Sequence, residues 1–144
     1  MLSLQERFSH ALHSTARAWR LALDRRLKDL GLSQAGWMTI AMAAKTSEPL
    51  SQIELAQRLG VEGSTMVAML DRLVKAGLLE RQPSPTDRRV RLIVLTESGM
   101  QLYGRVKTEA EAFRKELMVG VDADTLRIAT ELLEHLEQVA SAAE

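Results

Sequence analysis

The sequence predicts a mainly α-helical protein built around a helix-turn-helix that is followed at once by a short basic β-hairpin. Two observations predict this fold class. Apolar residues recur at helical spacing on both sides of Gly60, over residues 51–59 and 64–76. Two strand-like runs, 78–82 and 90–95, then flank the turn-forming segment Pro83-Ser84-Pro85-Thr86-Asp87-Arg88-Arg89. This order of elements defines a winged helix-turn-helix, with further long helices before and after it.

Two helices are predicted ahead of the helix-turn-helix. Large apolar side chains recur about every four residues in a long helix over 4–30: Phe8, Leu12, Trp19, Leu23 and Leu27. Gly31 ends that helix, and Ser33 caps a second one that runs to about Thr46. The pair Glu48-Pro49 then breaks the chain.

The helix-turn-helix carries its own start and stop signals. Ser51 and Glu54 form a capping box at the start of its first helix, and Gly60 supplies the positive φ that the turn requires. We expect Ser64 to cap the second helix and Gly77 to end it. The apolar side chains expected to face the core from this second helix are Val67, Leu70, Leu73 and Val74.

Two long amphipathic helices are predicted after the hairpin, one from Thr96 and one after Gly120 and Asp122. Their apolar stripes exceed what a winged helix needs, so they must be buried against something. One alternative is packing within a larger monomer. The other is packing against the same helices of a second subunit. We favour the second, because a twofold dimer of winged helices reads two half-sites on duplex DNA.

The composition excludes several classes of protein. The chain has no cysteine and only three histidines, so we expect no disulfide, no metal and no cofactor. It has no membrane-length apolar run and no signal-peptide pattern in residues 1–10, which predicts a cytoplasmic protein without a membrane partner. No nucleophile–base pair or phosphate-binding loop is present, so we expect no enzyme. The formal charge is zero, but basic side chains are in surplus over residues 1–95 and acidic ones over 96–144.

Four motifs carry a family resemblance: Leu50-Ser51-x-x-Glu54-Leu55-Ala56, Leu70-Asp71-Arg72-Leu73-x-x-x-Gly77-Leu78-Leu79-x-Arg81, Asp87-Arg88-Arg89 and Leu95-Thr96-x-x-Gly99. Together they resemble the MarR family of bacterial transcriptional regulators. The SlyA subgroup is similar in further stretches: Arg17-Ala18-Trp19-Arg20, Asp24, Arg26-Leu27-Lys28, Leu32-Ser33-Gln34 and Trp37. The resemblance implies a single MarR-type domain over 1–144, with dimerisation helices in 1–32 and 97–144 and a winged-helix DNA-binding lobe in 33–96.

The resemblance assigns the wing to DNA. In the family, the second arginine of the Asp-Arg-Arg motif enters a minor groove and is oriented by the aspartate. This implies those roles for Arg89 and Asp87, with Arg88 and Arg91 nearer the phosphates. A narrow loop that carries guanidinium groups suits the negative potential of a minor groove. The alternative for such a charge run is a solvated turn.

The second helix of the helix-turn-helix is the predicted recognition helix. Away from its expected apolar stripe lie Ser64, Thr65, Ala68, Met69 and Arg72. These five residues complete the predicted DNA-binding set together with the wing arginines and with Ser51 and Gln52 of the preceding helix.

Ala68 departs from the subgroup, which commonly has arginine at this position. The strongest guanine reader is therefore absent, and we predict readout by groove shape and by A·T-rich sequence. Met66 and Met69 have core packing as an alternative role. That alternative is favoured for Met66 and left open for Met69.

An effector pocket is also implied by the resemblance, because many family members bind small aromatic acids where the dimerisation helices meet the DNA-binding lobe. Arg17 would pair with a carboxylate and Trp37 would form an aromatic wall. The alternative is that Trp19 and Trp37 are core residues and that Arg17 forms a structural ion pair.

These expectations combine into a homodimeric, sequence-specific DNA-binding transcriptional regulator. It would act on a pseudo-palindromic operator, most commonly as a repressor, and respond to a small aromatic carboxylate. The alternative is a winged helix used for protein–protein contact, which the uncharged run 64–69 supports. The basic wing argues against that alternative, because a protein-docking surface has no evident need for it.

Overall fold

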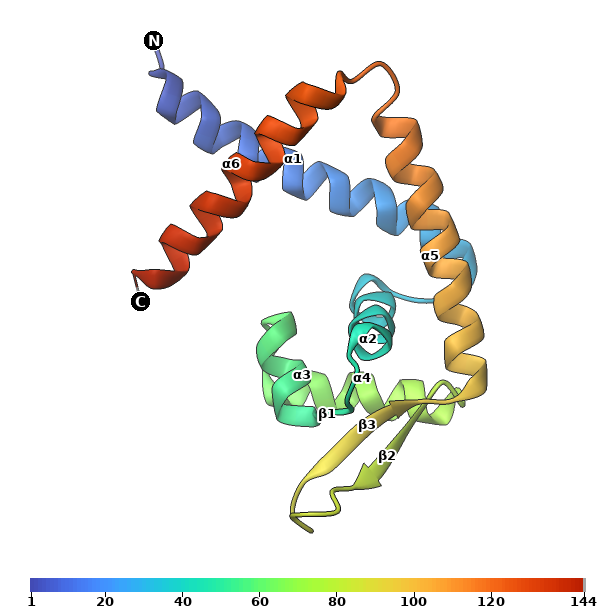
Figure 1. The fold of residues 1–144 in the computed structure, drawn as a ribbon. Helices are drawn as coiled ribbons and strands as arrows, with labels where there is room; N and C mark the ends of the chain where they lie inside the picture. Colours follow the sequence, from blue (N-terminus) through green and yellow to red (C-terminus); the bar gives the residue numbers. More distant parts are fainter. Residues whose placement is uncertain (144) are drawn as a thin grey trace. The chain divides into compact units, whose positions relative to one another are not determined.

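The computed structural model describes residues 1–143, which form two compact units, residues 1–111 and the segment from residue 112 onward. The first unit contains α1 (Leu4–Leu27), a short 3-10 helix η1 (Lys28–Leu30), α2 (Gln34–Lys45), β1 (Leu50–Ser51), α3 (Gln52–Leu59), α4 (Gly63–Lys75), β2 (Leu79–Pro83) and β3 (Arg91–Leu95). Helix α5 (Glu97–Leu117) begins in this unit, and α6 (Ala123–Ala142) lies in the second. Figure 1 shows these elements, which confirm the predicted winged-helix fold class.

Local capping sets the helix boundaries near the N-terminus. The Ser33 hydroxyl accepts a hydrogen bond from the Gly36 amide and starts α2, as predicted. Gly31 has φ of 76° and ends the helical segment as predicted, although its last three residues form the 3-10 helix η1 instead of continuing α1. Ser3 and Glu6 form a capping box at the start of α1 that the sequence analysis missed. Within α1, Leu23 and Leu27 are buried while Phe8 and Leu12 are exposed, so only the end of the helix packs in this chain.

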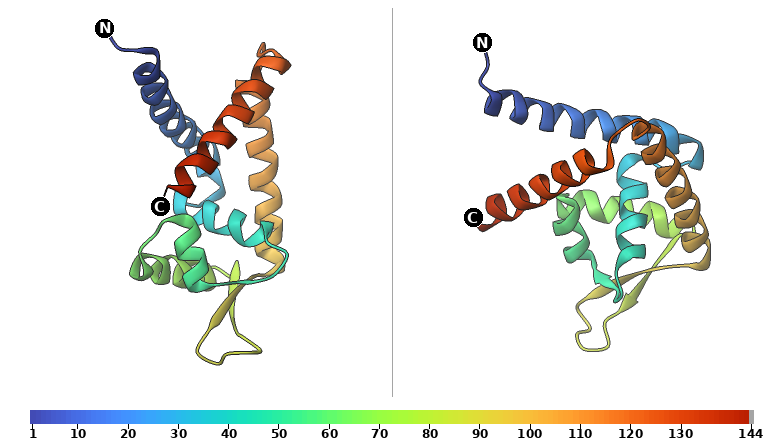
Figure 2. Two further views of the ribbon diagram at one scale, coloured as in Figure 1. Left: turned by 60° about the vertical axis from the view of Figure 1, so that its left-hand side comes forward. Right: turned by 45° about the horizontal axis from the view of Figure 1, so that its top comes forward.

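The winged-helix lobe, residues 33–96, packs three helices against a small antiparallel sheet with strand order β1-β3-β2. Strand β1 was not predicted. It pairs Leu50 with Ile93 and Ser51 with Leu92, and so ties the start of α3 to the hairpin. The core of the lobe draws on every one of its elements: Ile40, Leu50, Leu55, Ala56, Met66, Met69, Leu70, Leu73, Leu79 and Ile93. Figures 1 and 2 show the β2–β3 hairpin extending away from α3 and α4.

Helix α4 is rotated relative to the sequence prediction. Its buried residues are Met66, Met69, Leu70 and Leu73, whereas Val67, expected in the core, is 40% exposed. Ser64 is not the N-cap either. Glu62 occupies that position, and its side chain makes no capping bond. Both predictions were wrong. The buried face differs because Met66–Leu70–Leu73 and Val67–Leu70–Val74 both fit helical spacing, and packing against α2 and α3 selects the first.

Hydrogen bonds of Thr96 hold the connection between the β2–β3 hairpin and α5. The Thr96 hydroxyl donates to the Gly77 carbonyl at 2.6 Å and accepts from the Gly99 amide at 3.0 Å. The Thr96 amide donates to the Leu78 carbonyl at 3.2 Å. A Cβ on Gly99 would lie 2.1 Å from that carbonyl oxygen. The Leu95-Thr96-x-x-Gly99 motif therefore fixes the first turn of α5 against the end of α4.

The second unit is dominated by α6, whose start follows the prediction. Asp122 is its N-cap and accepts from the Thr125 amide at 2.9 Å. The Thr125 hydroxyl also donates to Asp122, at 3.1 Å. The amide hydrogen bond first, and then the hydroxyl one, lower the pKa of the Asp122 carboxyl. No described residue of α6 is buried. Its exposed apolar side chains are Leu126, Ile128, Leu132, Leu133, Leu136 and Val139.

Candidate nucleic-acid interface

The exposed side of α4 carries short polar and apolar side chains near its start and charges near its end. Ser64, Thr65 and Ala68 are exposed, as the predicted groove face requires, and so is Arg72. The rotation of the helix adds residues that the sequence analysis did not include: Val67, Asp71 and Lys75 are also exposed or partly so. Val67 therefore takes the place on this face that had been given to Met69.

Met69 and Ser51 are corrections to the predicted DNA-binding set. Met69 is 7% exposed and packs in the core of the lobe, as does Met66. Ser51 is buried, and its hydroxyl accepts a hydrogen bond from the Glu54 amide in the predicted capping box. The hydroxyl is therefore committed to the start of α3, where Gly60 with φ of 65° forms the following turn as predicted.

The wing is an exposed loop that is ordered by its own polar contacts. The Ser84 amide donates to the Val90 carbonyl and closes the loop at its base. The Ser84 hydroxyl accepts from the amides of Thr86 and Asp87 at 3.3 Å each. These contacts present the following arginines on a tight turn.

Asp87 and Arg89 form the pair that the resemblance implied. The Arg89 amide and Nε both donate to Asp87 Oδ1, at 3.0 and 3.3 Å, and a terminal guanidinium nitrogen lies 3.4 Å from Oδ2. The Arg89 side chain is nevertheless 91% exposed. The Arg89 backbone amide first, and then its guanidinium, lower the pKa of the Asp87 carboxyl. The aspartate is thus ionised at neutral pH. Its hydrogen bonds orient the Arg89 side chain, which is exposed to solvent.

Arg81 on β2 links the wing to both helices of the helix-turn-helix, a role that the sequence analysis did not assign. Its guanidinium contacts Asp71 Oδ1 at 2.7 Å and the Val67 carbonyl at 3.4 Å, both on α4. Its Nε donates to Gln52 Oε1 of α3 at 3.3 Å. Gln52, predicted to bind DNA, is half-buried and uses its amide oxygen in this contact.

Three arginines contribute unpaired positive charge to this face, in addition to the exposed Lys75 of α4. Within residues 1–143, Arg72, Arg88 and Arg91 take part in no ion pair, and all three are exposed. Guanidinium groups without a protein partner are available to phosphates. Arg88 and Arg91 therefore add to the charge that Arg89 presents on the wing.

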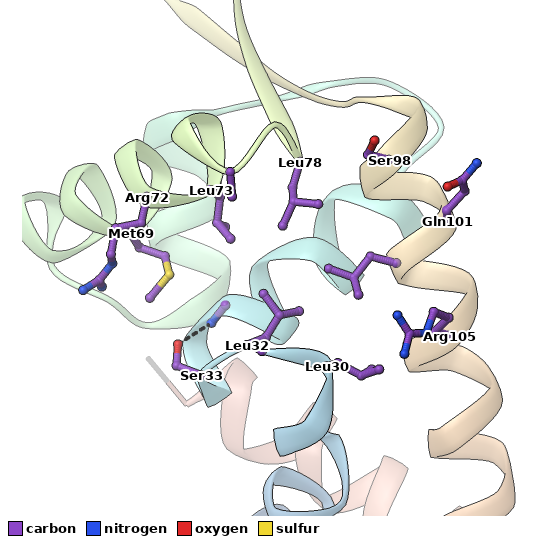
Figure 3. Close-up of a pocket in the computed structure, with 14 residues that line it drawn as sticks. Leu30, Leu32, Ser33, Met69, Arg72, Leu73, Leu78, Ser98, Gln101 and Arg105 are labelled. Atoms are coloured by element: carbon purple, nitrogen blue, oxygen red, sulfur yellow. Dashed lines mark hydrogen bonds between the residues drawn. The ribbon is translucent and has the colours of Figure 1, made fainter.

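The two residues predicted for an effector lie outside a cavity that is formed by residues of the first unit. Arg17 is exposed on α1, and Trp37 is half-buried and donates from Nε1 to Asp24 Oδ1 at 3.3 Å. Neither lines the cavity of about 710 Å³ that opens between the η1–α2 turn, α4 and the start of α5 (Figure 3). We call this space the α4–α5 cavity and define it by Leu30, Leu32, Arg72, Leu73, Leu78 and Arg105.

The fold and this surface define a winged helix-turn-helix protein with a basic wing. Residues 32–90 match the MarR family. A structure solved as transcriptional regulator PA3341 is 36% identical, with a TM-score of 0.86 over 94% of this chain and 98% of the other. Two others share the fold over 94% of this chain. A MarR-family regulator from Rhodococcus sp. RHA1 is 23% identical, with a TM-score of 0.81 over 96% of its chain. Wild-type MarR from E. coli is 24% identical, with a TM-score of 0.79 over 97% of its chain. The chain belongs to the MarR family.

Family membership settles the class of activity. MarR-family members are transcriptional regulators, which confirms the expectation that the chain is not an enzyme. Within the described residues no helix is long and apolar enough to cross a membrane. The same part of the chain holds no cluster of three or more metal-ligating side chains.

Proposed function

We propose that this protein is a homodimeric, sequence-specific DNA-binding regulator of the SlyA-like branch. The observation that carries the proposal is the wing, where Asp87 aims an exposed Arg89 and the neighbouring Arg88 and Arg91 have no protein partner within the described residues. The exposed start of α4 supplies the groups for the adjacent major groove: Ser64, Thr65, Val67 and Ala68. Recognition helices would occupy successive major grooves of a pseudo-palindromic operator.

The dimer is supported by apolar surface that this chain leaves uncovered. Leu4, Phe8 and Leu12 on α1 and the apolar side chains of α6 are exposed although both helices are amphipathic. An apolar stripe that an amphipathic helix leaves exposed is typical of an interface. A second copy offers the same surfaces and, by twofold symmetry, also duplicates the wing.

The biological outcome proposed is repression in the cytoplasm, by occupation of a promoter, with a small anionic ligand as modulator. The chain resembles a protein of known ligand, CouR from Rhodococcus jostii RHA1, which was solved bound to p-coumaroyl-CoA. The binding of an anionic ligand by that protein supports a modulator here. Arg17 and Trp37 remain the residues proposed for an aromatic carboxylate on the basis of the family resemblance.

The alternative function is protein–protein contact through α4. Its exposed face is uncharged from Ser64 to Ala68, which suits such contact as well as a groove rich in A·T pairs. The wing separates the two functions because its arginines favour phosphates.

A salt titration of binding to duplex DNA tests the proposal. Sedimentation should first give the mass of a dimer. Fluorescence anisotropy with a random duplex and with a duplex selected from the host genome should then show affinity that falls linearly with log salt concentration, with a slope near −0.9 for each phosphate contacted. The selected duplex should bind at least about a thousandfold more tightly. A monomer that ignores both duplexes at low salt would contradict the proposal.

A further inference from the structure

We infer that α4 recognises the 5-methyl group of pyrimidines in the major groove, through the adjacent side chains of Val67 and Ala68. Thymine and 5-methylcytosine carry this group at the same place on the ring. The affinity for DNA should therefore depend on the methyl group and not on the base that bears it. Such recognition rests on the proposed function, because α4 must first lie in a major groove.

Val67 and Ala68 lie in the middle of the solvent-facing side of α4. The four buried residues of the helix lie on its other side. We define the exposed stripe of α4 by five residues that follow at helical spacing: Ser64, Val67, Ala68, Asp71 and Lys75. Val67 is 40% exposed although its side chain is aliphatic. The two neighbouring aliphatic side chains therefore form a small apolar surface between the polar start of the stripe and its charged end.

No charged side chain of α4 competes with this apolar surface for the bases. Residues 63–70 of the helix include no charged residue. The first charge on the stripe, Asp71, is engaged by the Arg81 guanidinium at 2.7 Å. The same guanidinium lies 3.4 Å from the Val67 carbonyl oxygen, and Arg81 Nε donates to Gln52, so that Arg81 is committed to the protein. Bidentate recognition of guanine needs an arginine or a lysine, and the first two turns of α4 offer neither.

The chemistry of the major groove leaves one partner for an aliphatic side chain. Base edges show hydrogen-bond donors, acceptors and the 5-methyl group, and the methyl group is the only apolar one among them. Its burial against Val67 should raise affinity by about fourfold. The hydroxyls of Ser64 and Thr65 both donate and accept, so they discriminate little between bases. The methyl group is therefore the feature that α4 distinguishes best.

The surroundings of the apolar surface favour DNA over an apolar protein partner. Through Arg81 of β2, the hairpin is tied to α4 beside Val67. That hairpin presents Arg88 and Arg91, which take part in no ion pair within residues 1–143, and the same holds for Arg72 on α4. Guanidinium groups of this kind are available to phosphates. A small apolar surface among them suits methyl groups that lie between two phosphate backbones.

Base analogues in a selected duplex test the recognition. The duplex is first selected from random sequences by binding to the wild-type protein, and uracil then replaces thymine at one position of each half-site at a time. At a position under α4, loss of the methyl group should weaken binding by about fourfold for each half-site. The analogue 5-bromouracil should restore the affinity, because bromine is similar in size to a methyl group. At the same position, 5-methylcytosine should bind about fourfold more tightly than cytosine.

Variants of α4 assign the effect to Val67. Val67→Ala should reduce both ratios, thymine over uracil and 5-methylcytosine over cytosine, to below about twofold, because less apolar surface meets the methyl group. Circular dichroism and the melting temperature should stay unchanged, since Val67 is exposed. Arg72→Gln on the same helix is the matched control. It should weaken binding to all duplexes alike and keep both ratios.

Three results would overturn the recognition of methyl groups by Val67: equal affinity for thymine and uracil at every position, a selected half-site without thymine under α4, or unchanged ratios in Val67→Ala. A preference for thymine without one for 5-methylcytosine would show that the base is read and not the methyl group. Absence of binding to any duplex would instead contradict the proposed function, so the two failures are distinguishable.

Discussion

The recognition helix and the wing reach the proposed DNA face by different physical means. Helix α4 is anchored by four buried side chains, Met66, Met69, Leu70 and Leu73. The wing loop has no buried side chain between residues 84 and 90 and is ordered by polar contacts of Ser84 and Asp87. The orientation of α4 is thus set by the hydrophobic core, while that of the wing is set by hydrogen bonds. Stability and DNA affinity should therefore respond to different residues.

The largest effect should come from the anchor of α4. Met66 is 1% exposed, and Met66→Ala should lower the free energy of unfolding by about 2–5 kcal/mol, because a buried methionine leaves a cavity when truncated. Chemical denaturation measures this decrease. The neighbouring exposed Val67 provides the control, since Val67→Ala should change stability by less than about 1 kcal/mol. Equal decreases in both variants would contradict the observed rotation of α4.

Arg89 should show the opposite profile. Arg89→Ala should leave the denaturation midpoint unchanged and lower DNA affinity by about 1–3 kcal/mol for each half-site. It should also reduce the steepness of the salt dependence by about one for every phosphate that the variant no longer neutralises. Anisotropy titrations at several salt concentrations measure both quantities. Arg127→Ala, at an exposed arginine of α6, is the matched control and should leave affinity unchanged.

Arg81 connects the two regions, so its removal should couple them. Arg81→Met keeps the aliphatic stem and removes the contacts with Asp71, Val67 and Gln52. We expect stability to fall by about 1 kcal/mol, as for a partly exposed charge pair, together with a three- to tenfold weaker affinity for DNA. A double-mutant cycle with Asp71→Asn measures the coupling. Strictly additive effects would show that the bridge does not hold the wing to α4.

The smallest effect concerns the titration of Asp87. Because its pKa is lowered in the folded protein, the ion pair with Arg89 is fully present above the ordinary aspartate range and disappears only as pH falls through the lowered value. DNA affinity should therefore show no contribution from Asp87 between pH 5 and pH 8, about the range where aspartates stay ionised. Carboxyl NMR titration measures the pKa directly. In Arg89→Ala the value should rise only part of the way, because the backbone amide of residue 89 is the larger cause and remains.

The sequence was most informative where structure depends on neighbours along the chain. Ser33, the Ser51–Glu54 capping box, Gly60 and Asp122 were all placed correctly, because capping and positive φ are decided within three or four residues. The Asp87–Arg89 pair belongs to the same category, since its partners are two residues apart.

Features that depend on distant segments were missed or misplaced. The rotation of α4 depends on what α2 and α3 offer as a core, so Val67 and Met69 exchanged roles. Strand β1 exists only because Leu50 meets Ile93. The contacts of Arg81 span up to 29 residues, and the α4–α5 cavity combines residues from 30 to 105. No local pattern in the sequence contains this information.

The junction at Thr96 and Gly99 has a mechanical consequence. Its short bonds to the Gly77 and Leu78 carbonyls, with no room for even a methyl group at Gly99, make the hairpin and the first turn of α5 one stiff body. These contacts leave no flexible residue between the hairpin and the first turn of α5. We therefore expect the position of the hairpin to follow that of the first turn of α5.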